Sequence, residues 1–264
     1  MRTDDRRKRV DGPSGGCPRY EFAASVGQGN AANYAERLPG AFKCQRTDAA
    51  RRQEVGRPKV EIIESYLKSR FTNVVVDGIR EAFPGDQTLR HMRDATLVIG
   101  CVDNSFTRME VDVACRTSGR TLIDLGSGFA VNESGDSVIA SGGQVCISNP
   151  KGPCLQCLGF DVQGTENNYF LPGSSTPEPS SLLLNTVIAS LAVECAINIL
   201  IGTKLEFNKL SYDRRDFSVQ MTEARRDPSC RVCGEQSEAH INSVMPERPF
   251  ESLAQDARVL IRRP

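Results

Sequence analysis

The sequence predicts an α/β fold, namely a doubly wound, mostly parallel Rossmann-like sheet that carries a four-cysteine zinc knuckle and a crossover loop. Strand-like and helix-like segments alternate through the first half of the chain, as in a sheet whose parallel strands are joined by helices. The run ATLVIGCVD is continuously apolar, which is typical of a parallel strand covered on both faces. Two CxxC pairs lie far apart in the chain and favour a bound metal ion.

Local patterns predict the elements of the first half. Residues 1–21 have little hydrophobic periodicity and many turn formers, so we expect a disordered or divergent N-terminus. The segment 55–70 is predicted to be helical because its apolar residues fall on one face and Pro58 lies near the first turn. The predicted order is a strand at FAASV, a turn at GQGNAA, a short helix at NYAERL, the helix within 55–70, a strand at NVVVDGI, a helix at 85–92, a strand at ATLVIGCVD, a helix at 105–117 and a strand at TLIDLG.

The second half has a different pattern. Residues about 161–181 are rich in Gly, Pro, Ser and Asn, which predicts a long crossover loop of functional importance. The predicted order is one or two strands in SVIASGGQVCISN, a tight knuckle at GPCLQCLGF, the loop, an apolar helix at 182–201, strands in KLEFNKLSYD and FSVQM, and the second CxxC pair. We therefore expect one domain over residues 22–234 and a C-terminal tail over 235–264.

Composition and charge exclude several classes of protein. The 33 basic and 33 acidic residues cancel, so no global charge indicates a nucleic acid or an anionic membrane as partner. The apolar run at 182–201 contains Asn185, Glu194 and Asn198, which favour a helix of a soluble protein over a membrane span. The basic first ten residues lack the apolar core of a secretory signal, so we expect a cytoplasmic, reducing location for the ten cysteines.

The two CxxC pairs are the strongest chemical signal in the sequence. Cys154 and Cys157 form one pair, Cys230 and Cys233 form the other, and 72 residues lie between the two pairs. Two such knuckles can complete a tetrahedral four-thiolate zinc site, which leaves no open position and is therefore structural. The alternatives are two unrelated thiol pairs or a redox CxxC. The six other cysteines lie mostly in apolar settings that favour small buried residues over nucleophiles.

Several further residues are candidates for nucleotide chemistry. Asp103 follows a predicted parallel strand at the edge where open α/β sheets bind ligands, and a carboxylate there can hold Mg²⁺. Arg108 lies five residues later, and Lys59 lies in the first turn of a predicted helix, where an anion can bind. Gly27-x-Gly29-x-x-Ala32 has the pattern of a phosphate-binding turn. Each feature has an ordinary alternative: a helix cap for Asp103, a solvated side chain for Lys59 and a plain glycine-rich loop at Gly27.

The order of these motifs resembles the ThiF/MoeB/HesA family of adenylyltransferases, which includes the ubiquitin-activating enzymes. The resemblance covers about residues 54–234 and rests on separate stretches: VGRPKVEIIESYL, DATLVIGCVDNSFTR, TLIDLGSG, GPCLQCLG, LNTVIASLAVECAINILIG and DPSCRVCG. It implies ATP-dependent adenylation of the C-terminal glycine of a ubiquitin-like or sulfur-carrier protein ending in Gly-Gly. It also implies ATP, Mg²⁺ and structural Zn²⁺ as cofactors, and a homodimer.

The resemblance assigns roles to individual residues. Lys59 would contact the phosphates, and Asp103 would bind Mg²⁺. Arg108 matches the arginine that follows the Asp-Asn pair and would position that aspartate. Arg46 falls at the arginine of the family's Asn-Leu-x-Arg motif, which reads KCQR here. Gly27 and Gly29 would belong to the nucleotide loop, and the four paired cysteines to the zinc site.

The sequence departs from the family pattern in two places. Only sixteen residues separate Gly29 from Arg46, too few for the usual helix, strand and return, and Asp48 lies at the distance of a ribose-binding acid without a strand before it. The predicted crossover loop contains no cysteine, so we expect the reaction to stop at the adenylate or to pass it to a separate acceptor. Two other functions remain open: a catalytically impaired scaffold that still binds a carrier protein, and a nicotinamide or flavin oxidoreductase, which leaves the paired cysteines unexplained.

Overall fold

The structure of the protein is a computed structural model, which describes residues 22–26, 54, 56–102, 105–131, 137–160, 181–235 and 237. Several predicted segments therefore lie wholly or almost wholly outside the described residues: the N-terminal segment 1–21, the GQGNAA turn, the helix at NYAERL, the crossover loop and the C-terminal tail.

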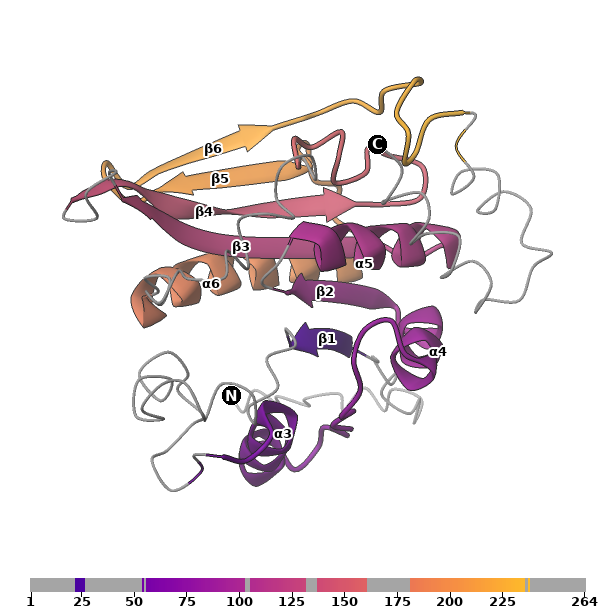
Figure 1. Cartoon of the computed structure of the whole chain (residues 1–264), viewed down its shortest axis with the longest axis vertical. Helices are drawn as coiled ribbons and strands as arrows, with labels where there is room; N and C mark the ends of the chain where they lie inside the picture. The colour runs from indigo at the N-terminus through magenta and orange to yellow at the C-terminus, as the bar shows by residue number, and fades with distance from the viewer. Residues whose placement is uncertain are drawn as a thin grey trace, which may run out of the picture.

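One six-stranded sheet runs through the described part of the molecule in the order β1-β2-β3-β4-β5-β6 (Figure 1). Its strands are β1 Phe22–Val26, β2 Leu97–Cys101, β3 Leu122–Val131, β4 Val138–Ser148, β5 Lys209–Asp213 and β6 Ser218–Thr222. The strand predictions at FAASV, ATLVIGCVD and TLIDLG are confirmed, and the segment 137–149 forms one strand.

The prediction of a mostly parallel sheet holds only for the first three strands. β1 pairs with β2 and β2 with β3 in parallel, whereas the three pairings from β3 to β6 are antiparallel. Short connections account for part of the difference, because a parallel neighbour needs a crossover of a dozen or more residues. Only six residues separate β3 from β4, and four separate β5 from β6.

Helices cover both faces of the sheet, so the doubly wound part of the prediction is confirmed. The helices are α3 Lys59–Arg70, α4 Asp86–Asp94, α5 Ser105–Thr117 and α6 Leu182–Leu200. Leu122 of β3 belongs to a core cluster with residues of α4 and α5, and its neighbour Ile123 belongs to a second cluster with residues of α6. Since successive strand residues point to opposite faces, α5 and α6 lie on opposite sides of the sheet (Figure 1).

α5 is the most deeply enclosed helix that the structure describes. All residues from Met109 to Thr117 are buried, including three charged ones. The cluster that contains α5 joins sheet residues such as Leu122 to knuckle residues such as Leu155 and Val232. α5 therefore lies between the sheet on one side and the two CxxC segments on the other.

The strand predicted at 73–79 is wrong. The structure has no regular secondary structure there, and the side chains of Val74 and Val75 are exposed. Three successive valines favour a strand locally, but a strand also needs a neighbour to accept its backbone hydrogen bonds, and no described strand lies alongside.

α6 lies on β3 and β4 with one face buried. By length and composition alone, it is the one helix among the described residues that could cross a membrane. In the fold, five of its residues enter the second core cluster: Leu184, Ile188, Ala192, Cys195 and Ala196. Its other face carries exposed apolar side chains.

Candidate functional site

A largely buried ion pair between Arg108 and Asp124 lies beside the carboxyl end of β2, where Asp124, the third residue of β3, pairs with Gly100. Arg108 is the fourth residue of α5, and its Nη1 donates to Oδ2 of Asp124 and to the carbonyl oxygen of Leu125, the latter at 2.9 Å. The two side chains are 12% and 1% exposed. Because ligands of open α/β sheets bind at this edge, the pair lies where nucleotide chemistry is expected.

Two glycines make room for this pair. A Cβ at Gly126 would lie 2.7 Å from Nη2 of Arg108, and a Cβ at Gly100 would lie 3.0 Å from Oδ1 of Asp124. Any larger residue at Gly126 would therefore displace the guanidinium from β3.

The environment of Asp124 opposes its charge. Burial raises the pKa of this carboxyl to about 7, although the charge and hydrogen bond of Arg108 act in the opposite direction. Its second oxygen, Oδ1, is buried and has no hydrogen-bond partner among the described residues. Since buried polar atoms are nearly always paired, Asp124 occupies a costly position that packing alone does not explain.

Asp124 was missed by the sequence analysis, which assigned Arg108 to the positioning of Asp103. One signal could have found it: Asp124 is the only charged residue in the apolar strand TLIDLG. A lone acid in a strand that is buried on both faces needs a cation, but the sequence does not identify that cation, because Arg116 of α5 lies nearer to Asp124 in the chain than Arg108 does.

The structure places only part of the predicted nucleotide site. Lys59 is the first residue of α3, as expected, and its side chain is exposed. No hydrogen bond or ion pair among the described residues joins Lys59 to Arg108 or Asp124. Five further candidates lie outside the described residues: Gly27, Gly29, Arg46, Asp48 and Asp103.

The strand register nevertheless relates the starts of two segments that lie outside the described residues. Val26, the last residue of β1, pairs with Cys101, the last residue of β2, in a parallel ladder. The chain therefore leaves both strands at the same edge of the sheet, one residue before Gly27 and two residues before Asp103.

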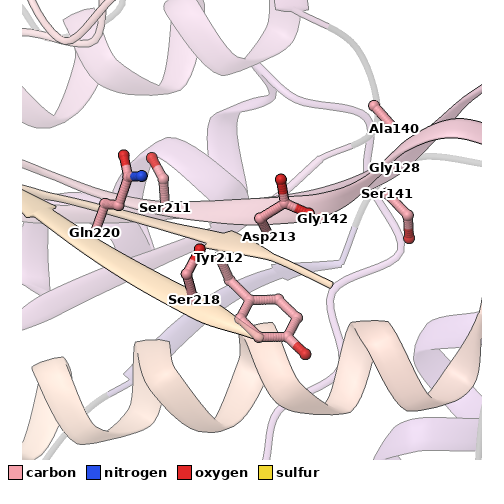
Figure 2. A pocket seen from close by; sticks show the side chains of 9 residues that line it. All are labelled: Gly128, Ala140, Ser141, Gly142, Ser211, Tyr212, Asp213, Ser218 and Gln220. Carbon is pink, nitrogen blue, oxygen red and sulfur yellow. The ribbon is translucent and has the colours of Figure 1, made fainter. Parts of the chain in front are cut away.

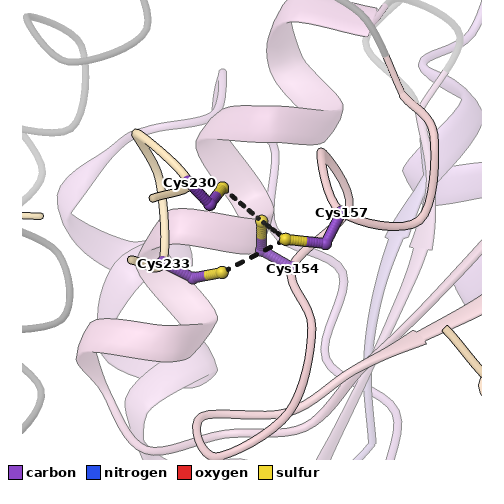
Figure 3. A group of neighbouring side chains, drawn as sticks. All are labelled: Cys154, Cys157, Cys230 and Cys233. Atoms are coloured by element: carbon purple, nitrogen blue, oxygen red, sulfur yellow. Dashed lines mark hydrogen bonds between the residues drawn. The ribbon is translucent and has the colours of Figure 1, made fainter. Parts of the chain in front are cut away.

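The four paired cysteines come together in one cluster (Figure 3). Their sulfur atoms all lie within 4.8 Å of one another, with close contacts of 3.5–3.7 Å, and all four are free thiols. In a tetrahedral site with zinc–sulfur bonds of about 2.3 Å, neighbouring sulfurs are about 3.8 Å apart. The cluster thus has the composition and spacing that a four-thiolate zinc site requires.

Hydrogen bonds within the cluster favour a thiolate at Cys230, whereas the same contacts raise the pKa of Cys154. Contacts from the thiols of Cys154 and Cys233 lower the pKa of Cys230, because they stabilise its charged form. The backbone nitrogen of Asp227 donates to Sγ of Cys157 at 3.5 Å. Such donors are typical of the surroundings of metal-binding sulfurs.

Two buried charges on α5 hold the first knuckle in place. Oδ1 of Asp112 accepts a hydrogen bond from Oγ of Ser148 at 2.5 Å, and its Oδ2 accepts one from the backbone nitrogen of Leu155 at 2.7 Å. Arg116 donates to the carbonyl oxygens of Asn149, Pro150 and Gly152 at 2.6–3.2 Å. Arg108, Asp112 and Arg116 are spaced by four residues, so one face of α5 contacts both β3 and the knuckle.

An open pocket of about 390 Å³ lies further along the same face of the sheet (Figure 2). Gly128 and Gly142, which pair across β3 and β4, form part of its floor, and polar side chains from β5 and β6 surround them. Asp124, Gly126 and Gly128 alternate along β3 and so share one face. The pocket begins about 13 Å from Asp124, the length of four strand residues.

Comparison with known proteins identifies the family: residues 44–232 match the ThiF family, which is well over half of the chain. The chain belongs to the ThiF family. The match includes Arg46, Lys59, Asp103 and Arg108, whereas β1 and the glycines of the GQGNAA turn lie outside it.

Curated relatives of this ThiF-family chain are distant but extensive. The SAMP-activating enzyme E1 of Haloferax volcanii is 25% identical over 83% of the chain and 77% of that protein. The sulfur carrier protein ThiS adenylyltransferase of Escherichia coli is 24% identical over 69% of the chain and 67% of that protein. The molybdopterin-synthase adenylyltransferase of Salmonella typhimurium is 24% identical over 88% of both.

A solved structure shares the fold. The crystal structure of E. coli MccB with ATP matches 82% of the ThiF-family chain and 67% of its own chain, with a TM-score of 0.60 and 15% sequence identity. At this identity the likeness concerns the fold alone.

Proposed function

We propose that the chain is an adenylyltransferase that activates the C-terminal glycine of a ubiquitin-like or sulfur-carrier protein with ATP. The observation that carries the proposal is the ThiF-family match over residues 44–232, together with relatives that are named as activating enzymes and adenylyltransferases of such carriers. The guanidinium of Arg108 is largely buried in its ion pair with Asp124. The family match includes Arg108 together with the predicted nucleotide residues Arg46, Lys59 and Asp103.

The proposed reaction joins two anions. A carboxylate oxygen of the carrier attacks the α-phosphorus of ATP, the bond to the β-phosphate breaks, and an acyl-adenylate and pyrophosphate are released. Both reactants are negatively charged, so the site must supply cations that offset their repulsion and stabilise the charge that develops on the phosphorus oxygens. When bound, Mg²⁺ supplies part of that charge.

Different residues of this chain would supply the cations and hold the Mg²⁺. The side chain of Lys59 is exposed at the start of α3, which suits direct phosphate contact. The family resemblance places Arg46 at the arginine of the Asn-Leu-x-Arg motif, within the matched residues. Asp103 would hold Mg²⁺. The guanidinium of Arg108 already donates to Asp124 and Leu125, which favours a positioning role over direct contact with phosphate.

The pocket beside Gly128 supports a carrier tail that ends in Gly-Gly. A Cβ at Gly128 would meet nothing within 4 Å, so this part of β3 has open space above its backbone. An extended tail without side chains could lie there and reach the Arg108 end of the same strand face. The guanidinium of Arg108 lies against Gly126, two residues before Gly128 on the same face of β3, so it borders the path of such a tail.

Structural zinc is the second part of the proposal. The cluster of Cys154, Cys157, Cys230 and Cys233 would hold Zn²⁺ with four thiolates and no open position, so the ion would join the segment before the crossover loop to the segment after β6. Its role would be to hold the fold together, because no ligand position remains for chemistry.

A homodimer is the third part, and the exposed face of α6 supports it. Its apolar residues are symmetric about Ser190: Val187 and Val193 lie three residues on either side, and Leu183 and Ile197 lie seven. Two copies of α6 packed antiparallel around a two-fold axis at Ser190 would therefore place apolar side chains against apolar side chains. A self-complementary surface of this kind fits a second copy of the chain better than an unrelated partner.

Exchange of label between pyrophosphate and ATP tests the proposed activity. The zinc-loaded full chain is incubated with a carrier protein that ends in Gly-Gly, ATP and Mg²⁺. We expect carrier-dependent exchange, loss of exchange with Asp103→Ala, and normal exchange with Asp94→Asn, an exposed carboxylate at the end of α4. Absence of exchange in the unaltered chain with several such carriers would contradict the proposal.

A further inference from the structure

Arg108 connects three separate parts of the fold. Its guanidinium donates to Asp124 and Leu125 on β3, and it lies 5.7 Å from the ring centroid of Phe160, which follows the first CxxC knuckle. Since Arg108 is only the fourth residue of α5, these contacts fix the first turn of that helix. The residues that immediately precede this turn in the chain are Asp103 and Asn104.

Asp124 is the acceptor on which this arrangement depends. It is almost completely buried, and the two charged residues that act on its charge, Arg108 and Asp112, both lie on α5. The thiols of Cys101 on β2 and Cys146 on β4 also interact with it electrostatically. Arg108 is the only cation among these groups, so it alone offsets the buried carboxylate.

A buried carboxylate at position 124 destabilises the fold more than a purely structural role would require. An apolar residue at position 124 would pack into the same core and would remove a buried oxygen, Oδ1, that has no hydrogen-bond partner in the part of the chain that the structure describes. Replacing a buried ion pair with apolar residues is often neutral or stabilising. A charged pair kept at the edge where the nucleotide is expected therefore indicates function.

We propose that Asp124 is a positioning residue for adenylation: through Arg108 it holds the first turn of α5, which follows Asp103 closely in the sequence, beside the carboxyl end of β2. The inference rests on the proposed adenylation and adds to it a residue that contacts neither nucleotide nor carrier. It predicts that loss of the Asp124 charge weakens the response to Mg²⁺ more than it weakens carrier binding.

The test compares Asp124→Asn, Arg108→Ala and the double variant with the unaltered chain, all zinc-loaded. Pyrophosphate exchange gives kcat, the KM for carrier and the half-saturating Mg²⁺ concentration, and calorimetry gives the affinity for ATP with Mg²⁺. We expect each single variant to raise the half-saturating Mg²⁺ about tenfold, with little change in the KM for carrier. The double variant should be no worse than either single one, because the two residues act as one unit.

Asp112→Asn is the matched control for lost stability. It removes a buried carboxylate that contacts Ser148 and Leu155 and whose charge raises the pKa of Asp124. Its loss should therefore lower the melting temperature but favour the charged form of Asp124, so the Mg²⁺ requirement should not rise. Exchange by the unaltered chain should also fall as the pH drops below about 7, where Asp124 becomes protonated, and Asp124→Asn should lack that fall.

The outcomes separate this inference from the proposed function. If the unaltered chain is active and Asp124→Asn keeps its Mg²⁺ requirement and pH profile, with only a lower melting temperature, the positioning role is wrong and the adenylation proposal stands. If the unaltered chain neither binds ATP with Mg²⁺ nor exchanges pyrophosphate, the proposed function fails and the positioning role fails with it.

Discussion

Oδ2 of Asp112, in the middle of α5, accepts a hydrogen bond of 2.7 Å from the backbone nitrogen of Leu155, inside the first CxxC knuckle. The carboxyl of Asp112 is fully buried, and burial raises its pKa because the charged form is destabilised there. The same helix begins at the proposed nucleotide site and carries Arg108 in its first turns. α5 therefore connects the knuckle to the carboxyl end of β2.

Asp112→Ala should weaken zinc binding about ten- to a hundredfold, because removal of a group that orients metal ligands typically has an effect of this size. Competition with a coloured zinc chelator measures the affinity, and Asp94→Asn serves as the control, since its side chain is exposed on α4. Equal zinc affinity of the two variants would mean that the knuckle holds its shape without α5.

The melting temperature of the protein should fall as the pH rises through about 7. The pKa of Asp124 is raised from 3.8 to about 7, so between these values the folded protein binds a proton that the unfolded chain does not. The stabilisation is fully present below about pH 4 and is lost as the pH passes 7. Scanning calorimetry from about pH 5.5 to about pH 8 should give a slope that Asp124→Asn flattens and Asp94→Asn leaves in place.

Gly128→Val should impair the use of carrier protein without harming the fold. The backbone of Gly128 is not in the left-handed region, and a Cβ there meets no atom within 4 Å, so valine fits β3. Its side chain would fill the floor of the pocket and raise the KM for carrier about tenfold or more, with ATP binding unchanged. Gly128→Ala should have a smaller effect, and Thr222→Val, exposed at the far end of β6, should have none.

Ile197→Glu should convert the proposed dimer to a monomer. A two-fold pairing about Ser190 places each Ile197 against Leu183 of the second copy, where a buried charge without a partner is strongly unfavourable. Light scattering after size exclusion measures the mass in solution. Lys68→Glu on exposed α3 is the control, and a dimer that survives Ile197→Glu would show that another surface joins the copies.

The elements that local patterns predict well are those that tertiary pairing reinforces. A helix was expected at 105–117, and α5 spans Ser105–Thr117. The apolar residues of this segment and the strands predicted on either side of it both indicate a helix. The segment 73–79 has equally strong local preference, yet it forms no strand, since pairing depends on a neighbour that a local pattern does not reveal. The strands of the second half were predicted and are present as β4, β5 and β6, but their antiparallel pairing was missed for the same reason.

The candidate site likewise has one part that the sequence predicts and one part that it does not. The cysteine cluster could be predicted from spacing alone, because four thiols in two knuckles have few other uses. The Arg108–Asp124 pair could not, since its members are sixteen residues apart and belong to a helix and a strand whose contact only the fold defines. The roles of Lys59, Arg46, Asp103 and the two glycines stay predictions.

The central claim is tested most directly by the intact mass of a Gly-Gly carrier after incubation with the zinc-loaded chain, ATP and Mg²⁺. The account predicts that the carrier gains one AMP group at its C-terminal carboxyl, and that hydroxylamine removes it as expected of an acyl-adenylate. It also predicts no thiol-sensitive conjugate between the carrier and any of the ten cysteines of the chain. A carrier that binds the chain and stays unmodified, with no pyrophosphate released, would contradict the account.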